Sequence, residues 1–205
     1  MNDGLVFVID DDELVRRALS RLLRSAGLQV QTFPSAKAFL DATPLDRPAC
    51  LVLDLQLPGP SGLELQAALI RAGRDIPIVF VTGHGDVPSS VRAMKSGAVD
   101  FLQKPFDGQE LLDCVTRALS RSREQRAERA ERAVLRERHA TLTSREREVL
   151  KLVVTGRLNK QIAGDLGVAE KTVKVHRGRV MAKMQAGSVA ELVRMVEKLG
   201  EERAP

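Results

Sequence analysis

The stretch that decides the fold reads CLVLDLQLPGPSG and spans residues 50–62. Its short apolar run predicts a strand that is buried on both faces. The strand ends at Asp54, because the loop of Pro and Gly residues that follows cannot continue it. Open α/β sheets place their ligand sites at the carboxyl ends of such strands, so Asp54 is the first candidate functional residue.

Four more segments predict strands: apolar runs at residues 5–9 and 77–82, an alternating segment at 28–33, and a short segment at 99–102. Segments with helical spacing of apolar residues lie between the strands and after the last one. Because strands and helices alternate, we expect a parallel sheet covered by helices on both faces. The predicted fold class is α/β, with a flavodoxin-like, doubly wound, five-stranded sheet of order 2-1-3-4-5.

Composition is typical of soluble proteins of a reducing compartment. Hydrophobic residues make up 43% of the sequence and charged residues 29%, and no apolar run is long enough to span a membrane. The start of the chain lacks the layout of a signal peptide, so we expect a cytoplasmic protein with no membrane partner. Cys50 and Cys114 lie in apolar segments without ligand-like spacing and are predicted to be buried thiols.

The two parts of the chain differ in charge. Residues 1–120 carry 12 Lys and Arg against 15 Asp and Glu, whereas residues 121–205 carry 20 against 12. All six Phe residues lie in the acidic part. This difference predicts two domains with different partners, and a polyanion as the partner of the basic one. With the order of the elements, we expect an α/β domain at 1–120, a helical linker at 121–141 and a basic domain at 142–205.

The linker sequence is rich in Arg, Glu, Ala and Gln, which are strong helix formers. Its apolar stripe fades, so a stable coiled coil is not expected. We interpret it as a solvated helical spacer, and an arm that binds nucleic acid is the alternative.

The basic domain is predicted to be all-α, with four helices. Residues 143–146 (TSRE) form a capping box for the first helix, and Asn159 is placed to cap the second. Gly167 and Val168 make a tight turn before a third helix that starts at Lys171. A short helix, a turn and a second helix make the helix-turn-helix layout, in which the second helix enters the major groove of DNA.

The acidic domain contains a second group of candidate residues. In a parallel sheet the carboxyl ends of strands one, three, four and five meet at one edge, which is expected to hold Asp10, Asp11, Asp54, Thr82 and Lys104. Each residue alone has a plain explanation; the acids after the first strand, for example, are placed to cap the next helix. Together, three carboxylates repel one another and need a cation, and an oxygen site with room for water and phosphate favours Mg²⁺.

Phosphoryl transfer needs an in-line nucleophile, a metal and positive donors. Asp54 is the best nucleophile, because it alone stands at the end of the central strand. Lys104 supplies a point charge and Thr82 a hydroxyl for the phosphoryl oxygens. The sequence therefore predicts that Asp54 accepts a phosphoryl group.

The acidic pair, together with DLQLPGPSG, VTGHGD and DFLQKPF, resembles the receiver domain of bacterial response regulators. The resemblance implies that a sensor histidine kinase phosphorylates Asp54. It also implies that Asp11, Asp54 and the backbone carbonyl of Gln56 bind Mg²⁺, while Asp10 assists through water.

The same resemblance implies a conformational switch. Thr82 is expected to turn toward the phosphate and Phe101 to turn inward. These movements would reshape the face of the fourth helix, fifth strand and fifth helix, which is the usual dimer surface of the family. His84 has two explanations of equal weight, as a residue that tunes dephosphorylation or as a plain loop residue.

Residues 142–184, especially NKQIAGDLGV and TVKVHRGRVMAKM, resemble the LuxR-type helix-turn-helix of FixJ-like response regulators. The cations of the predicted third helix form either a solvated basic face or a DNA-binding face, and the layout favours DNA; they are Lys171, Lys174, Arg177, Arg179 and Lys183. The resemblance implies base contacts for Lys174, Val175 and Gly178. It implies base or phosphate contacts for Lys171, Thr172, His176, Arg177 and Arg179.

Three residues depart from what a stable helix-turn-helix would favour. Ala169 stands where relatives usually have a Ser or Thr cap, and Gly164 and Gly178 lie inside helices. Each feature costs about 1 kcal/mol of helix stability. Gly178 either allows close approach to DNA or removes a base contact that a longer side chain would make.

The sequence thus predicts a phosphorylation-switched transcription factor and not an enzyme. Phosphorylation promotes dimerisation, releases an inhibitory contact between the domains, or does both; RNA polymerase is a further candidate partner, and the resemblance favours activation. A hydrolase that forms an aspartyl phosphate usually has a second acid two residues after the nucleophile, where this chain has Gln56. RNA binding is a third hypothesis, disfavoured because the basic domain has no Phe, Tyr or Trp for base stacking.

Overall fold

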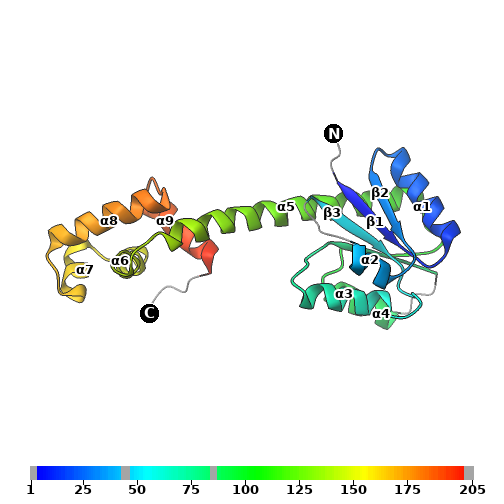
Figure 1. Ribbon diagram of the computed structural model, residues 1–205, viewed down its shortest axis with the longest axis horizontal. Coiled ribbons are helices and arrows are strands. Elements are labelled where there is room, and N and C mark those ends of the chain that lie inside the picture. The colour runs from blue at the N-terminus through cyan, green and yellow to red at the C-terminus, as the bar shows by residue number, and fades with distance from the viewer. Residues whose placement is uncertain (1–3, 43–46, 84–86, 201–205) are drawn as a thin grey trace. The chain divides into compact units, whose positions relative to one another are not determined.

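The computed structural model describes residues 4–42, 47–83 and 87–200. They form two compact units that divide between Arg126 and Ala127 (Figure 1). Within these described ranges, no helix has both the length and the apolar character that crossing a membrane requires.

The first unit is built on a parallel sheet. Its strands are β1 (Leu5–Ile9), β2 (Gln29–Phe33), β3 (Ala49–Leu53), β4 (Ile78–Thr82) and β5 (Asp100–Gln103). Their order is β2-β1-β3-β4-β5, and every neighbouring pair is parallel, so the predicted fold class and strand order are confirmed. The three central strands are buried along their whole length, which is why they are continuous apolar runs.

Helices cover both faces of this sheet (Figure 1). One core holds the Val side chains of β1 against α1 (Glu13–Ser25) and the first part of α5 (Gly108–Ala140). The opposite core holds Phe7 and Phe80 against α2 (Ala36–Ala42), α3 (Gly62–Arg71) and α4 (Val87–Lys95). Both cysteines are buried as predicted, and burial raises the pKa of Cys50 to about 12 and that of Cys114 to about 11.

Helix α5 includes most of the segment predicted as a linker. Ser122, in the first unit, is buried, and its hydroxyl oxygen accepts a hydrogen bond of 3.0 Å from the backbone N–H of Ala49. In the second unit Leu135 is buried, and Glu131 forms a 2.6 Å ion pair with Lys198. Each end of the predicted linker therefore packs on its own unit. The segment as a whole is not a solvated spacer.

The second unit is all-α, as predicted. Its helices after α5 are α6 (Ser144–Val154), α7 (Asn159–Leu166), α8 (Glu170–Met184) and α9 (Val189–Leu199). The predicted capping box opens α6: the Thr143 hydroxyl accepts from the N–H of Glu146, whose carboxylate accepts from the N–H of Thr143. The four helices share one core, which includes Leu150, Ile162, Val173, Val180 and Leu192.

The predicted cap at Asn159 is wrong. Leu158 occupies the N-cap position, and its backbone N–H donates a 2.8 Å hydrogen bond to the side chain of Gln161. Asn159 is the first residue of α7, and its side-chain oxygen accepts a 3.0 Å hydrogen bond from Arg177. Asn159 therefore ties α7 to α8 and does not cap its own helix.

Glu146 is a charged residue in the core of the second unit, with only 2% of its surface exposed. Its carboxylate accepts a 2.6 Å hydrogen bond from Lys183, which belongs to this ion pair and not to an open basic face. The bond to Lys183, followed by that from the N–H of Thr143, lowers the pKa of Glu146 to about 2. A lowered pKa contributes stability that is present above pH 4.5, the ordinary value, and that is lost as the pH falls toward 2.

We expect Glu146→Gln to lower the free energy of unfolding of the second unit by about 2 kcal/mol at neutral pH, and by progressively less in acid. Hydrogen exchange of the α6 and α8 amides in the full chain measures this change. Glu148→Gln is the matched control, because Glu148 lies on the same helix and pairs with Arg145 at an exposed position. Equal effects of the two substitutions, or a Glu146 effect that grows in acid, would contradict the assignment.

Candidate functional site

The structure brings four of the predicted site residues together at the carboxyl edge of the sheet. Asp10 and Asp11 follow β1, Asp54 follows β3, and Lys104 follows β5. Carboxylate oxygens of the three acids lie within 4.8 Å of one another. The Lys104 ammonium donates to Asp10 over 2.8 Å and to Asp54 over 3.0 Å, so one cation bridges two acids.

The two bridged acids are buried, with 2% of Asp10 and 9% of Asp54 exposed. The second oxygen of Asp10 accepts a 2.9 Å hydrogen bond from the N–H of Asp12, and that of Asp54 a 3.0 Å bond from the N–H of Gln56. Asp11 is exposed. The cluster is therefore fixed from inside the protein and open to solvent on the side of Asp11.

The charges of the site are not balanced. Burial raises the pKa of Asp10 by more than the hydrogen bonds from Lys104 and the N–H of Asp12 lower it. Burial lowers the pKa of Lys104, but its hydrogen bonds to Asp10 and Asp54 outweigh burial, and the pKa is raised. Lys104 thus stays charged, and one lysine faces three carboxylates. This all-oxygen donor set with an excess of negative charge fits a hard divalent cation such as Mg²⁺.

The remaining residues predicted for this edge lie around the cluster. Thr82 ends β4, is 1% exposed, and accepts a 2.8 Å hydrogen bond at its backbone carbonyl from the N–H of Lys104. Phe101 on β5 is half-buried, with its ring centroid 6.3 Å from that of Phe80. The Gln56 side chain is exposed, and His84 lies outside the described residues.

Sequence reasoning missed two residues that shape this site. Arg16 donates from one guanidinium nitrogen to the backbone carbonyls of Asp10 and Asp11, over 2.7 and 2.8 Å. Gly62 begins α3 so close to the phosphoacceptor candidate that a Cβ there would lie 2.4 Å from the carbonyl oxygen of Asp54. A Gly at the first position of a helix was the available signal for Gly62, whereas the spacing of Arg16 along its helix does not identify its partner.

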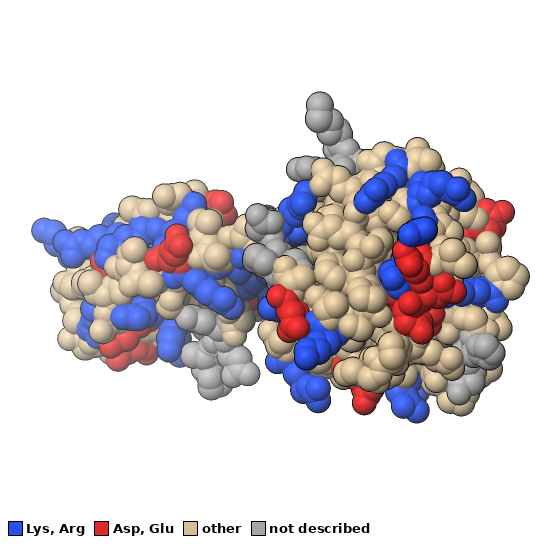
Figure 2. All heavy atoms as spheres, turned by 45° about the vertical axis from the view of Figure 1, so that its right-hand side comes forward, with Lys and Arg blue, Asp and Glu red and all other residues tan. Residues whose placement is uncertain are grey.

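The second candidate site is the outer face of α8. Val173 and Val180 point into the core, whereas an exposed face carries residues at helical spacing: Lys171, Lys174, Val175 and Gly178. Thr172 and Arg179 are also exposed. Lys and Arg side chains are spread over the surface of the second unit in Figure 2. This face thus combines cations with small side chains, and its residues are exposed in the part of the unit that the structure describes.

Two residues predicted to contact DNA are partly covered by the second unit itself. Arg177 is half-buried and bonded to Asn159, and His176 is half-buried, with a ring nitrogen that has no hydrogen-bond partner among the described residues. Ala169 occupies the N-cap of α8 without a side-chain hydrogen bond, so the predicted missing cap is confirmed.

Comparison with known proteins places both units in families. Residues 6–116 match the response regulator receiver domain, and residues 140–196 match the bacterial regulatory proteins of the luxR family. Nodulation protein W of Bradyrhizobium diazoefficiens is 54% identical over 197 residues, which cover 96% of this chain and 87% of that protein. The transcriptional regulatory protein FixJ of Azorhizobium caulinodans is 51% identical over 191 residues, which cover 93% and 90%.

Two solved structures of response regulators are also similar to this chain. The response regulator StyR has a TM-score of 0.82 and 50% identity, over 96% of this chain and 99% of that chain. Full-length FixJ from B. japonicum has a TM-score of 0.57 and 42% identity, over 96% and 97%. The chain therefore belongs to the FixJ-like two-component response regulators, in which a receiver domain is joined to a LuxR-type DNA-binding domain that regulates transcription.

Proposed function

We propose that a sensor histidine kinase transfers a phosphoryl group to Asp54, and that this modification promotes dimerisation and DNA binding by the LuxR-type domain. The observation that supports phosphate acceptance best is the bridge from Lys104 to Asp10 and Asp54 beside the exposed Asp11. The protein would act in the cytoplasm as a regulator, most simply an activator that contacts RNA polymerase, and not as an enzyme with a separate substrate.

The chemistry assigns one task to each side chain. An oxygen of Asp54 attacks the phosphorus, and the P–N bond to the donor histidine breaks as the P–O bond forms. Lys104 pairs with a phosphoryl oxygen and the Thr82 hydroxyl donates to another. Asp11, Asp54 and the Gln56 carbonyl would hold Mg²⁺, with Asp10 assisting through water, and the metal would neutralise charge on the phosphoryl group.

The switch would connect this pocket to a surface on α4 and β5. Thr82 turning toward the phosphate leaves space into which Phe101, half-buried beside Phe80, can turn. Val87, Val91 and Met94 form an apolar stripe along α4 at helical spacing, with 75%, 45% and 44% of their surfaces exposed. Such a stripe on a neighbouring helix supports dimerisation through this face.

DNA recognition is assigned to the outer face of α8. Lys174, Val175 and Gly178 would face base edges, where they select the sequence. The other contacts, to phosphates or bases, would come from Lys171, Thr172, His176, Arg177 and Arg179. Phosphate contacts set the affinity and its dependence on salt.

Intact-mass measurement tests the phosphate acceptor. Incubated with a small-molecule phosphodonor and Mg²⁺, the wild-type chain is expected to gain one phosphoryl group, and Asp54→Asn none. Asp41→Asn, at an exposed position on α2, is the matched control and is expected to behave like the wild type. A phosphoryl group on the Asp54→Asn chain would identify a different acceptor.

Gly178 allows a test of the DNA-binding face. A Cβ at Gly178 or at Gly164 would meet no atom within 4 Å, so Ala at either position is expected to stabilise its helix by about 1 kcal/mol. If Gly178 approaches DNA closely, Gly178→Ala will also weaken DNA binding about tenfold, a cost of about 1.4 kcal/mol. Gly164→Ala, on α7, is expected to stabilise without weakening binding. Unchanged affinity of the Gly178→Ala protein would remove this residue from the interface.

A further inference from the structure

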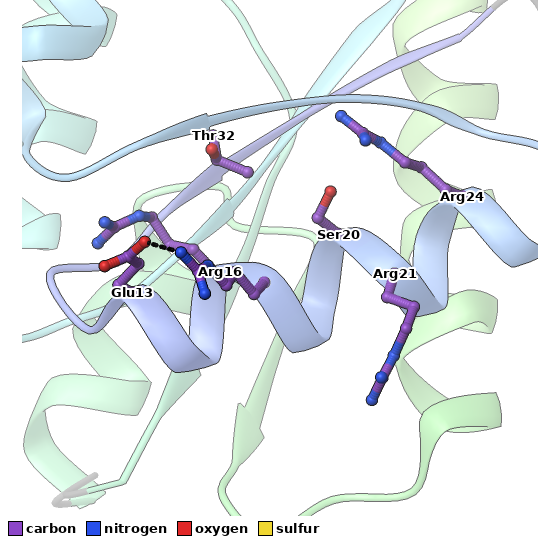
Figure 3. Close-up of a pocket in the computed structure, with 7 residues that line it drawn as sticks. Glu13, Arg16, Ser20, Arg21, Arg24 and Thr32 are labelled. Atoms are coloured by element: carbon purple, nitrogen blue, oxygen red, sulfur yellow. Dashed lines mark hydrogen bonds and ion pairs between the residues drawn. The ribbon is translucent and has the colours of Figure 1, made fainter.

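Arg16 connects helix α1 to the loop that carries two acids of the site. Its Nη1 donates to the backbone carbonyls of Asp10 and Asp11, over 2.7 and 2.8 Å. Arg16 is half-buried and lines a groove along α1 together with Glu13 (Figure 3). One nitrogen thus bridges two consecutive peptide groups, which limits rotation of the peptide plane between the two acids.

Other hydrogen bonds hold the same loop. Asp12 caps α1 by accepting from the N–H of Leu14, and its own N–H donates to the carboxylate of Asp10. Lys104 holds the other oxygen of Asp10. Among the described residues, the one hydrogen bond to Asp11 is the bond that its backbone carbonyl accepts from Arg16. Arg16 therefore restrains the backbone of Asp11, from which its carboxylate extends.

We propose that Arg16 is a positioning residue for the metal site: it fixes the backbone of Asp10 and Asp11 so that their carboxylates are oriented before Mg²⁺ binds. This inference rests on the proposed function, because it assumes the Mg²⁺ site. Groups that orient metal ligands without touching the metal typically contribute a factor of 10 to 100 to metal affinity.

The sign of the effect separates positioning from charge. Arg16 is a cation beside a site for a divalent cation, so by charge alone its removal would strengthen Mg²⁺ binding. Positioning has the opposite sign, since a loop that must be ordered on binding costs affinity. Lys at this position keeps the charge but is a shorter side chain without the planar fork of guanidinium, so it is expected to bridge the two carbonyls poorly.

The test is a titration of the full chain with Mg²⁺, without a phosphodonor, followed by NMR shifts of backbone amides. Arg16→Gln is expected to weaken Mg²⁺ binding about tenfold or more, and Arg16→Lys to weaken it in part. Arg17→Gln is the matched control: it removes the same charge from the next residue of α1, which pairs with Glu13 at an exposed position. We expect the control to change the affinity by less than about twofold.

Mg²⁺ affinity of the Arg16→Gln protein equal to or higher than that of the Arg17→Gln protein would overturn the proposal. If Arg16→Gln does not fold, Arg16→Lys decides, because undiminished Mg²⁺ affinity of that variant would equally contradict positioning. Failure of the wild-type chain to bind Mg²⁺ is a separate outcome, which would overturn the metal site of the proposed function itself.

Discussion

Replacing Lys104 with Met is expected to slow phosphorylation of Asp54 by about 100-fold or more. Among the described residues, Lys104 is the one side-chain cation bonded to carboxylates of the cluster, and it touches those of both Asp10 and Asp54. Removing a preorganised donor that stabilises charge in a transition state typically costs a factor of 100 to 1,000. The measurement is the initial rate of phosphoryl gain by intact mass at fixed phosphodonor and Mg²⁺.

The same substitution has an effect on protonation. The pKa of Asp10 is already raised by burial, and the hydrogen bond from Lys104 opposes that rise. Without the lysine the pKa of Asp10 will be higher still, so the rate that remains should begin to fall at a higher pH than in the wild type. Lys37→Met on α2, an exposed position, is the control and should leave the rate unchanged. A similar rate in both variants would show that Lys104 has no part in the transfer.

Replacing Gly62 with Ala is expected to destabilise the first unit by about 3 kcal/mol and to displace Asp54. The added Cβ would lie 2.4 Å from the carbonyl oxygen of Asp54 and 3.1 Å from the Cα of Leu55, and neither backbone atom can move alone. Overpacking of a rigid contact costs about 1–3 kcal/mol. Because the displaced residue is the proposed phosphate acceptor, the phosphorylation rate should fall as well.

Gly83→Ala is the matched control for Gly62→Ala. Gly83 follows β4 at the same edge of the sheet, and a Cβ there would meet no atom of the described residues within 4 Å. We expect this variant to unfold at the wild-type denaturant concentration, whereas Gly62→Ala unfolds at a lower one. Equal stability of the two variants would mean that α3 can shift away from Asp54 at little cost.

Most of the fold could be predicted from hydrophobic pattern. The three central strands are short apolar runs with clear ends, and the alternation of strands with helices leaves few topologies. The gathering of Asp10, Asp54 and Lys104 follows from the same rule, because the carboxyl ends of parallel strands meet at one edge. These inferences need only the order of the elements along the chain.

Contacts that depend on side-chain reach could not be predicted in this way. Lys183 belongs by spacing to the basic helix, but its ammonium pairs with the buried Glu146 on another helix. Asn159 has the right residue type for a cap, but Leu158 occupies the N-cap position of α7. The side chain of Asn159 instead accepts a hydrogen bond from Arg177. Arg16 could equally have pointed into solvent, because helical spacing fixes the direction of a side chain and not its partner.

The central claim is that phosphorylation of Asp54 controls DNA binding by α8. The most direct test measures the affinity of the full chain for a duplex selected from random DNA, with and without a small-molecule phosphodonor and Mg²⁺ at fixed ionic strength. The wild-type chain is expected to bind about tenfold more tightly when phosphorylated, and Asp54→Asn to show no response. An equal response of Asp54→Asn, or a phosphorylated wild-type chain with unchanged affinity, would contradict the account.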